Sequence, residues 1–110
     1  MGENKPGRTV ECRVPEASAL DLENLITYQQ KAIVSRILAQ GAFGSLTLFA
    51  FDAGETLSEH TTPFEALAYI LDGEAEITIG GHSLGVHKGQ LVRLPANVPH
   101  ALKAPNRFKM

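Results

Sequence analysis

Residues 54–73, GETLSEHTTPFEALAYILDG, together with residues 89–100, GQLVRLPANVPH, decide how this chain folds. Each stretch combines a short apolar run with the glycine and proline that bound β-strands. His60 lies in the first stretch and His100 ends the second, so we predict that the two histidines lie on separate strands of one barrel. Histidines that converge from separate strands indicate a pocket for a metal ion or a ligand.

Five short runs outside and within these stretches predict β-strands. Each run is rich in β-branched or aromatic residues and is bounded by glycine, proline, aspartate or asparagine. The expected fold class is therefore all-β. The runs are AIVSRIL (32–38), SLTLFAF (45–51), ALAYIL (66–71), AEITIG (75–80) and QLVRL (90–94).

Glycine-containing dipeptides predict how the strands connect. Asp72-Gly73 precedes the fourth run and Gly80-Gly81 ends it, and both dipeptides supply the positive φ of tight hairpin turns. We therefore expect sequential antiparallel hairpins. A jelly-roll barrel would remove most of the exposed edges of so many short strands. The final residues, RFKM at 107–110, are interpreted as the beginning of one further strand.

The chain of 110 residues fits one domain. Residues 1–15 mix charged residues, glycine and proline without periodicity, which predicts a flexible N-terminal arm. Residues 16–110 are expected to form the single β-barrel domain. Within it, residues 17–28 predict one short helical turn, with Ser18 as the N-cap.

Composition excludes several classes of partner. Ten basic and twelve acidic residues are well mixed and give a net charge of −2, so neither nucleic acid nor a membrane surface is an expected partner. No apolar run approaches the roughly twenty residues of a spanning helix. Cys12 is the only cysteine, and the first residues lack the apolar region of a secretory signal. These features favour a cytoplasmic protein.

The first stretch follows a known motif, G-x5-H-x-H-x3-4-E-x6-G. Gly54, His60 and Gly73 match it, whereas Thr62 stands in place of the second histidine and Ala66 in place of the glutamate. On these residues the chain resembles the cupins, and in particular a small single-domain bacterial cupin of the cupin 2 conserved-barrel family. The resemblance implies a cupin-type double-stranded β-helix, which is a jelly-roll barrel.

The second stretch follows the second cupin motif, G-x5-P-x-G-x2-H-x3-N. Gly89, Pro95 and His100 match it, while Asn97 replaces a glycine and Ala104 replaces an asparagine. The two motifs together imply the fold more strongly than they imply a chemistry, because only part of the usual ligand set is present.

The resemblance implies a site for one divalent transition metal (Zn, Fe, Mn, Ni or Cu), with His60 and His100 as ligands. Glu65 lies one residue before the motif's carboxylate position, and a β-bulge before it would turn it toward the histidines as a third ligand. Without the bulge, strand alternation directs Glu65 to the opposite face. His82 and His87 are expected at solvated hairpin ends.

The candidate ligand-binding residues line the predicted barrel interior. Thr62 and Ala66 remove charge and leave volume where the motif has a histidine and a glutamate, which suits an apolar or bulky ligand. Ala68 shares the face of Ala66 by alternation. Phe51 is a further candidate, although an aromatic residue at strand spacing also fills a core.

Three functions are compatible with these residues. The first is binding of a divalent metal and action on a small organic molecule, of the oxygenase or isomerase type, with no catalytic residue assigned. The alternative is a non-catalytic cupin that binds a small molecule without a tight metal. The third is a homodimer in which the N-terminal arm covers an exposed strand edge.

Overall fold

The computed structural model describes residues 10–110, and residues 1–9, which form most of the predicted arm, lie outside the described residues. The regular secondary structure of the described part is almost entirely β, as the short strand-like runs predict. It contains one short 3-10 helix, η1 (Leu22–Leu25), and the strands β1 (Glu11–Cys12), β2 (Ile33–Gly41), β3 (Gly44–Phe51), β4 (Thr56–His60), β5 (Ala66–Tyr69), β6 (Asp72–Ile79), β7 (His82–His87), β8 (Leu91–Leu94), β9 (His100–Lys103) and β10 (Phe108–Lys109).

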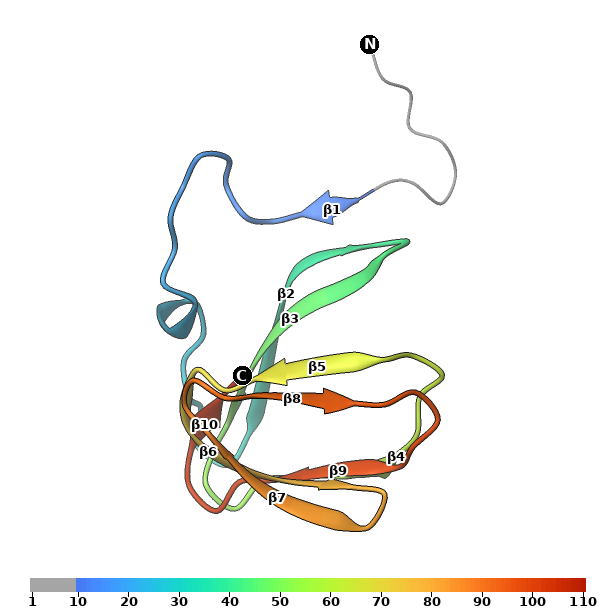
Figure 1. Ribbon diagram of the computed structural model, residues 1–110. Helices are drawn as coiled ribbons and strands as arrows, with labels where there is room; N and C mark the ends of the chain where they lie inside the picture. Colours follow the sequence, from blue (N-terminus) through green and yellow to red (C-terminus); the bar gives the residue numbers. More distant parts are fainter. Residues whose placement is uncertain (1–9) are drawn as a thin grey trace.

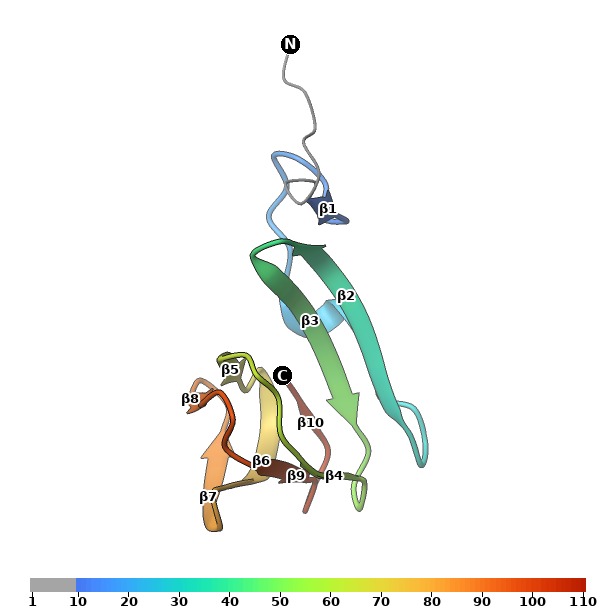
Figure 2. The ribbon, with the colours of Figure 1, turned by 90° about the vertical axis from the view of Figure 1, so that its right-hand side faces the viewer.

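The strands form a jelly-roll barrel, as expected. One antiparallel sheet has the order β1-β2-β3-β10-β6-β9-β4, with β7 also paired to β6, and β5 pairs with β8 in a separate two-stranded sheet. Figure 1 shows the β5–β8 pair lying across the barrel from β6, β9 and β4. In Figure 2 the long β2–β3 hairpin lies on the side of the molecule opposite β7 and β8 and extends beyond the barrel.

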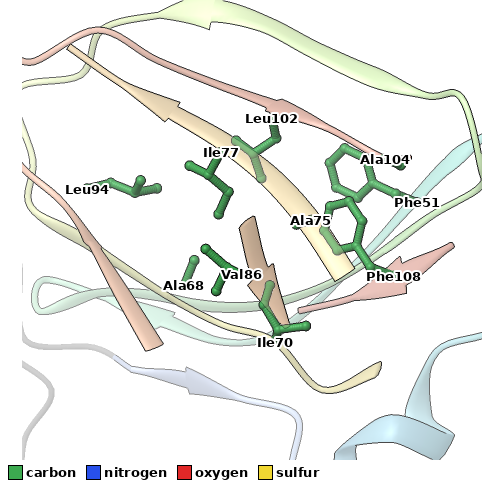
Figure 3. Close-up of a cluster of buried hydrophobic side chains, with 10 residues drawn as sticks. All are labelled: Phe51, Ala68, Ile70, Ala75, Ile77, Val86, Leu94, Leu102, Ala104 and Phe108. Carbon is green, nitrogen blue, oxygen red and sulfur yellow. The ribbon is translucent and has the colours of Figure 1, made fainter. Parts of the chain in front are cut away.

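The barrel interior is filled by apolar side chains from both sheets. Phe51 and Phe108 are fully buried, and their rings stack with centroids 4.4 Å apart. Figure 3 shows these rings at one end of a cluster whose side chains point toward one another from opposite layers. Ten buried residues form this cluster: Phe51, Ala68, Ile70, Ala75, Ile77, Val86, Leu94, Leu102, Ala104 and Phe108.

A second, smaller core joins the segment before β2 to the outer face of the β2–β3 hairpin. Ile26 is buried there with Leu38, Leu48 and Ala50. The Tyr28 hydroxyl also donates a hydrogen bond to Asp72 at 2.5 Å, and burial of this hydroxyl raises the pKa of Tyr28. The segment from η1 to β2 is therefore packed on the barrel.

The predicted hairpin between the third and fourth runs is wrong. β5 pairs with β8 rather than with β6, and Asp72-Gly73 forms the start of β6, paired with Lys109 and Phe108 of β10. Gly73 has a positive φ of 73° and lies very close to the main chain just before β10. A Cβ at this position would overlap the carbonyl oxygen of Arg107. The Gly80-Gly81 turn, by contrast, does join the β6–β7 hairpin.

Two expectations at the ends of the chain have different outcomes. The helical turn begins after Asp21 rather than after Ser18, whose hydroxyl donates to the Glu16 carbonyl instead. The final residues do enter a strand, β10, as expected.

Among residues 10–110, no helix has the length and apolar character that crossing a membrane requires.

Candidate functional site

The structure brings His60 and His100 together. His60 ends β4, His100 begins β9, and the two are direct partners in this antiparallel pair. Their ring centroids lie 4.3 Å apart, with the ring planes at 67° in an edge-to-face arrangement. The cross-strand pairing of the backbone therefore creates the contact between the rings.

A β-bulge sets this pairing. The register shifts between Leu57, which pairs with Leu102, and His60, which pairs with His100. Two residues of β4 therefore oppose one residue of β9. In an unbroken register Glu59 would face His100, so the bulge determines that the partner is a second imidazole.

The backbone fixes the tautomer of both rings. His60 Nδ1 lies 2.9 Å from the carbonyl oxygen of Ser58, and His100 Nδ1 lies 3.3 Å from that of Val98. A carbonyl oxygen only accepts hydrogen bonds, so each Nδ1 carries the proton and donates it. In the neutral form each Nε2 is then a free acceptor or ligand atom.

The two rings differ in access to solvent. His100 is buried, with 6% of its surface exposed, and lies between His60 on β4 and Ile79 on β6. His60 is exposed. The pair is therefore open to solvent on the His60 side and covered on the His100 side.

Thr62, two residues after His60, forms hydrogen bonds with the main chain of its own loop and of the loop between β8 and β9. Its hydroxyl donates to the Phe64 carbonyl at 3.2 Å, and its carbonyl accepts a hydrogen bond from the Asn97 N–H at 2.7 Å. Asn97 has a φ of 63°, a left-handed conformation that asparagine tolerates better than most residues. The residue that replaces the motif glycine thus keeps the conformation that favours glycine.

Glu65 is held by partners other than the histidines. One carboxylate oxygen accepts a hydrogen bond from Arg93, and the other accepts the N–H of Ala96 at 2.8 Å. The hydrogen bond from Arg93 holds the pKa of Glu65 below its usual range. These contacts join the residue before β5 to β8 and to the loop between β8 and β9. The role of Glu65 as a metal ligand stays a prediction.

The other candidate ligand-binding residues belong to the core or to a cleft away from the histidines. Phe51 is fully buried in its stack with Phe108, and Ala68 is 8% exposed in the same cluster. Ala66 and Ala68 also line a cleft of about 240 Å³ between β3 and β5, which we call the β3–β5 cleft. Neither His60 nor His100 lines it.

The donor set meets the requirement for a tight metal site only in part. In His60 and His100 the Nδ1–H is bound to a carbonyl oxygen and Nε2 is left as the donor atom, as in metal-binding imidazoles. Among residues 10–110, however, no three histidine, cysteine, aspartate or glutamate side chains are grouped to hold a metal ion. Durable transition-metal sites use at least three protein ligands, so these residues do not fit a tightly held metal.

Sequence reasoning missed the groups that orient the imidazoles. Both are main-chain carbonyls two residues before their histidine, at Ser58 and Val98. A carbonyl has no signature in the sequence, so no residue pattern could have identified them. The Arg93 partner of Glu65 was also missed, because it depends on the pairing of β5 with β8, which was not predicted from the sequence.

Comparison with known proteins agrees with the resemblance that the two sequence motifs indicate. Residues 47–109 match the family model for the cupin domain. A conserved protein of unknown function from Streptococcus pyogenes is similar, with 36% identity, a TM-score of 0.81 and coverage of 89% of this chain and 86% of the other. A cupin superfamily protein from Desulfitobacterium hafniense has 32% identity, a TM-score of 0.80 and coverage of 89% and 90%.

A curated relative extends the similarity less far. An uncharacterized protein of Streptomyces coelicolor is 36% identical over 56 residues, which is 51% of this chain and 53% of that protein. The match thus spans about half the length of each. The salicylate 1,2-dioxygenase of Pseudoaminobacter salicylatoxidans, a variant of which has been solved, is 15% identical with a TM-score of 0.64, a likeness of fold alone.

Proposed function

Because the chain belongs to the cupin family, we propose that it is a small-molecule-binding cupin that works without a tightly held metal. Its recognition element is the His60–His100 pair, and its ligand is a small organic acid. The observation that supports this is the orientation of two adjacent rings by backbone carbonyls, which leaves the Nε2 atom of each ring available as an acceptor, with His60 exposed and His100 buried.

The chemistry of the pair suits an acid group. A neutral imidazole whose Nδ1–H is already used accepts a hydrogen bond at Nε2, and the O–H of a carboxylic acid is a strong donor to it. Transfer of that proton gives an imidazolium and a carboxylate, which is a charge-assisted pair of about twice the strength of a neutral hydrogen bond. Ile79 beside His100 provides an apolar wall.

The second candidate is a metal-assisted enzyme of the oxygenase or isomerase type. The same two Nε2 atoms favour it, because they are the atoms that a divalent metal would bind. It requires water or the substrate to complete the ligand set. The two candidates are separated by whether the purified protein retains metal.

The acid-binding proposal predicts specific changes in the histidine spectrum. We expect at least one of acetate, benzoate and succinate to shift the imidazole nitrogen resonances of His60 and His100 saturably in uniformly labelled protein. His60→Ala should weaken this binding about tenfold, which corresponds to one lost hydrogen bond to a charged group of about 1.4 kcal/mol. Because His60 is exposed, the variant should fold normally.

His82→Ala is the matched control, because His82 is an exposed histidine at the β6–β7 turn. This variant should bind the acids as the parent does. If none of the three acids shifts these resonances, or if His60→Ala binds with unchanged affinity, the proposal is wrong.

A further inference from the structure

Two loops at one end of the barrel adjoin the histidine pair. The β4–β5 loop (residues 61–65) begins directly after His60, and the β8–β9 loop (residues 95–99) ends directly before His100. Each loop connects the sheet that holds β4 and β9 with the β5–β8 sheet. Figure 1 shows both connections at the same end of the barrel, on the right of the view. A contact between the loops therefore bears on how the two histidines lie toward each other.

The β8–β9 loop is fixed to the body of the barrel. β9 lies between β6 and β4 in its sheet, so that His100 pairs with Ile79 on one side and with His60 on the other. Just before it, the Pro99 carbonyl accepts a hydrogen bond from the Gly80 N–H at 2.9 Å. The place of His100 is therefore set by β6 as well as by β4.

His60 has less support than His100. It is exposed and ends β4, and within the part of the chain that the structure describes, β4 pairs only with β9. An edge strand of this kind is held on one side only. The regular register of β4 is also interrupted between Leu57 and His60. The end of β4 therefore depends on what holds the β4–β5 loop.

The β4–β5 loop is held by the β8–β9 loop and by β8. The Thr62 carbonyl accepts the Asn97 N–H at 2.7 Å, and one Glu65 oxygen accepts the Ala96 N–H at 2.8 Å. Two consecutive N–H groups of the β8–β9 loop are thus bound by two acceptors of the β4–β5 loop. The other Glu65 oxygen accepts a hydrogen bond from Arg93 on β8. Glu65 therefore joins the loop that follows His60 to the loop that precedes His100.

The chemistry of this contact requires a carboxylate. An ionised carboxylate only accepts hydrogen bonds, and in Glu65 one oxygen serves a main-chain N–H while the other serves a guanidinium. Charge-assisted bonds of this kind are stronger than neutral ones. An exposed ion pair by itself contributes little to global stability, so the effect of this contact is expected to be local, on the two loops and the histidines beside them.

We propose that Glu65 is a positioning residue for the His60–His100 pair. By joining the two loops, it holds the end of β4 in place and keeps the His60 ring against His100, with its Nδ1–H bound to the Ser58 carbonyl. It acts through the loops rather than by contact with the ligand. The proposal extends the proposed function, and its consequence for acid binding rests on that function.

The test records the imidazole spectra of labelled protein without any added acid, at mildly alkaline pH, where imidazoles are neutral. A single tautomer keeps the Nδ1 and Nε2 resonances of a ring far apart, and adjacent rings give a nuclear Overhauser effect between their protons. Glu65→Gln keeps the size of the side chain but cannot accept from both donors. In this variant we expect the two nitrogen resonances of His60 to move toward each other and the Overhauser effect with His100 to be lost.

Two further variants separate reach from charge. Glu65→Asp keeps the charge, but its side chain is one methylene shorter and loses one of the two partners, so it should change the His60 spectrum as Glu65→Gln does. Glu59→Gln is the matched control, because Glu59 is an exposed carboxylate next to His60 in the sequence. It removes the same charge but leaves the loop contacts, and the spectrum of His60 should keep both features. Because Glu65 is also exposed, all three variants should fold as the parent does.

Unchanged His60 resonances and an unchanged Overhauser effect in both Glu65 variants would overturn the proposal, even if the melting temperature fell, because the role of Glu65 would then be structural only. The same spectral changes in Glu59→Gln would also overturn it, because loss of charge would then be the cause. Acid binding is measured separately. If the parent binds none of the acids, the proposed function fails and the spectral test still decides the role of Glu65. If the parent binds them, Glu65→Gln should weaken binding, but by less than His60→Ala does.

Discussion

Replacing Phe108 by alanine is expected to lower the free energy of unfolding by about 3–5 kcal/mol. Phe108 is fully buried, stacks on Phe51 and holds β10 between β3 and β6. Truncation removes the buried ring and leaves a cavity, because Phe51 is fixed on the neighbouring strand and cannot move to fill it. Urea unfolding followed by circular dichroism measures the effect.

The effect is large for a domain of this size, whose total stability is about 5–15 kcal/mol. Phe64→Ala is the control, because Phe64 is 73% exposed, and it should change stability by no more than about 0.5 kcal/mol. A loss below about 1.5 kcal/mol in the Phe108 variant would show that β10 does not anchor the core.

Gly73→Ala is expected to be the second large change. Gly73 combines a φ of 73° with close contact to the backbone of residues 107 and 108. A methyl group there meets the Arg107 carbonyl oxygen, and neither main chain can move without breaking the pairing of β6 with β10. The expected cost is the left-handed conformation, about 1–2 kcal/mol, plus overpacking, about 1–3 kcal/mol.

Gly54→Ala separates these two contributions. Gly54 has a similar φ of 88°, but a Cβ there would meet no atom within 4 Å. This variant should therefore lose only the conformational part, about 1–2 kcal/mol. Equal losses for the two variants in the same urea experiment would contradict the close-approach explanation for Gly73.

Much of the fold could be predicted from local sequence. The strand runs were visible because β-branched and aromatic residues lie between glycine, proline and asparagine breaks. Which strands pair with one another was harder to predict. Asp72-Gly73 has the composition of a hairpin turn, yet β10, which lies more than thirty residues away, takes the place that a hairpin partner would have. A dipeptide reports its own backbone preference and not which strand lies beside it.

The candidate site, like the fold, could be predicted from the sequence only in part. Motif spacing placed His60 and His100 on separate strands, and the structure shows their rings in contact. The bulge before His60 was not foreseen, because no residue near Ser58 or Glu59 specifies it. The Glu65 environment depends on Arg93 and on the Ala96 N–H, which come from a different part of the chain and become neighbours only in the folded barrel.

The most direct test of the proposed function is the metal content of untagged protein purified without chelators, measured by plasma mass spectrometry beside a His60→Ala control. Two imidazoles without a third protein ligand should retain far less than one metal ion per chain, with no difference between the two proteins. Near-stoichiometric metal that is lost in His60→Ala would contradict the account and would assign the pair to a metal-assisted enzyme.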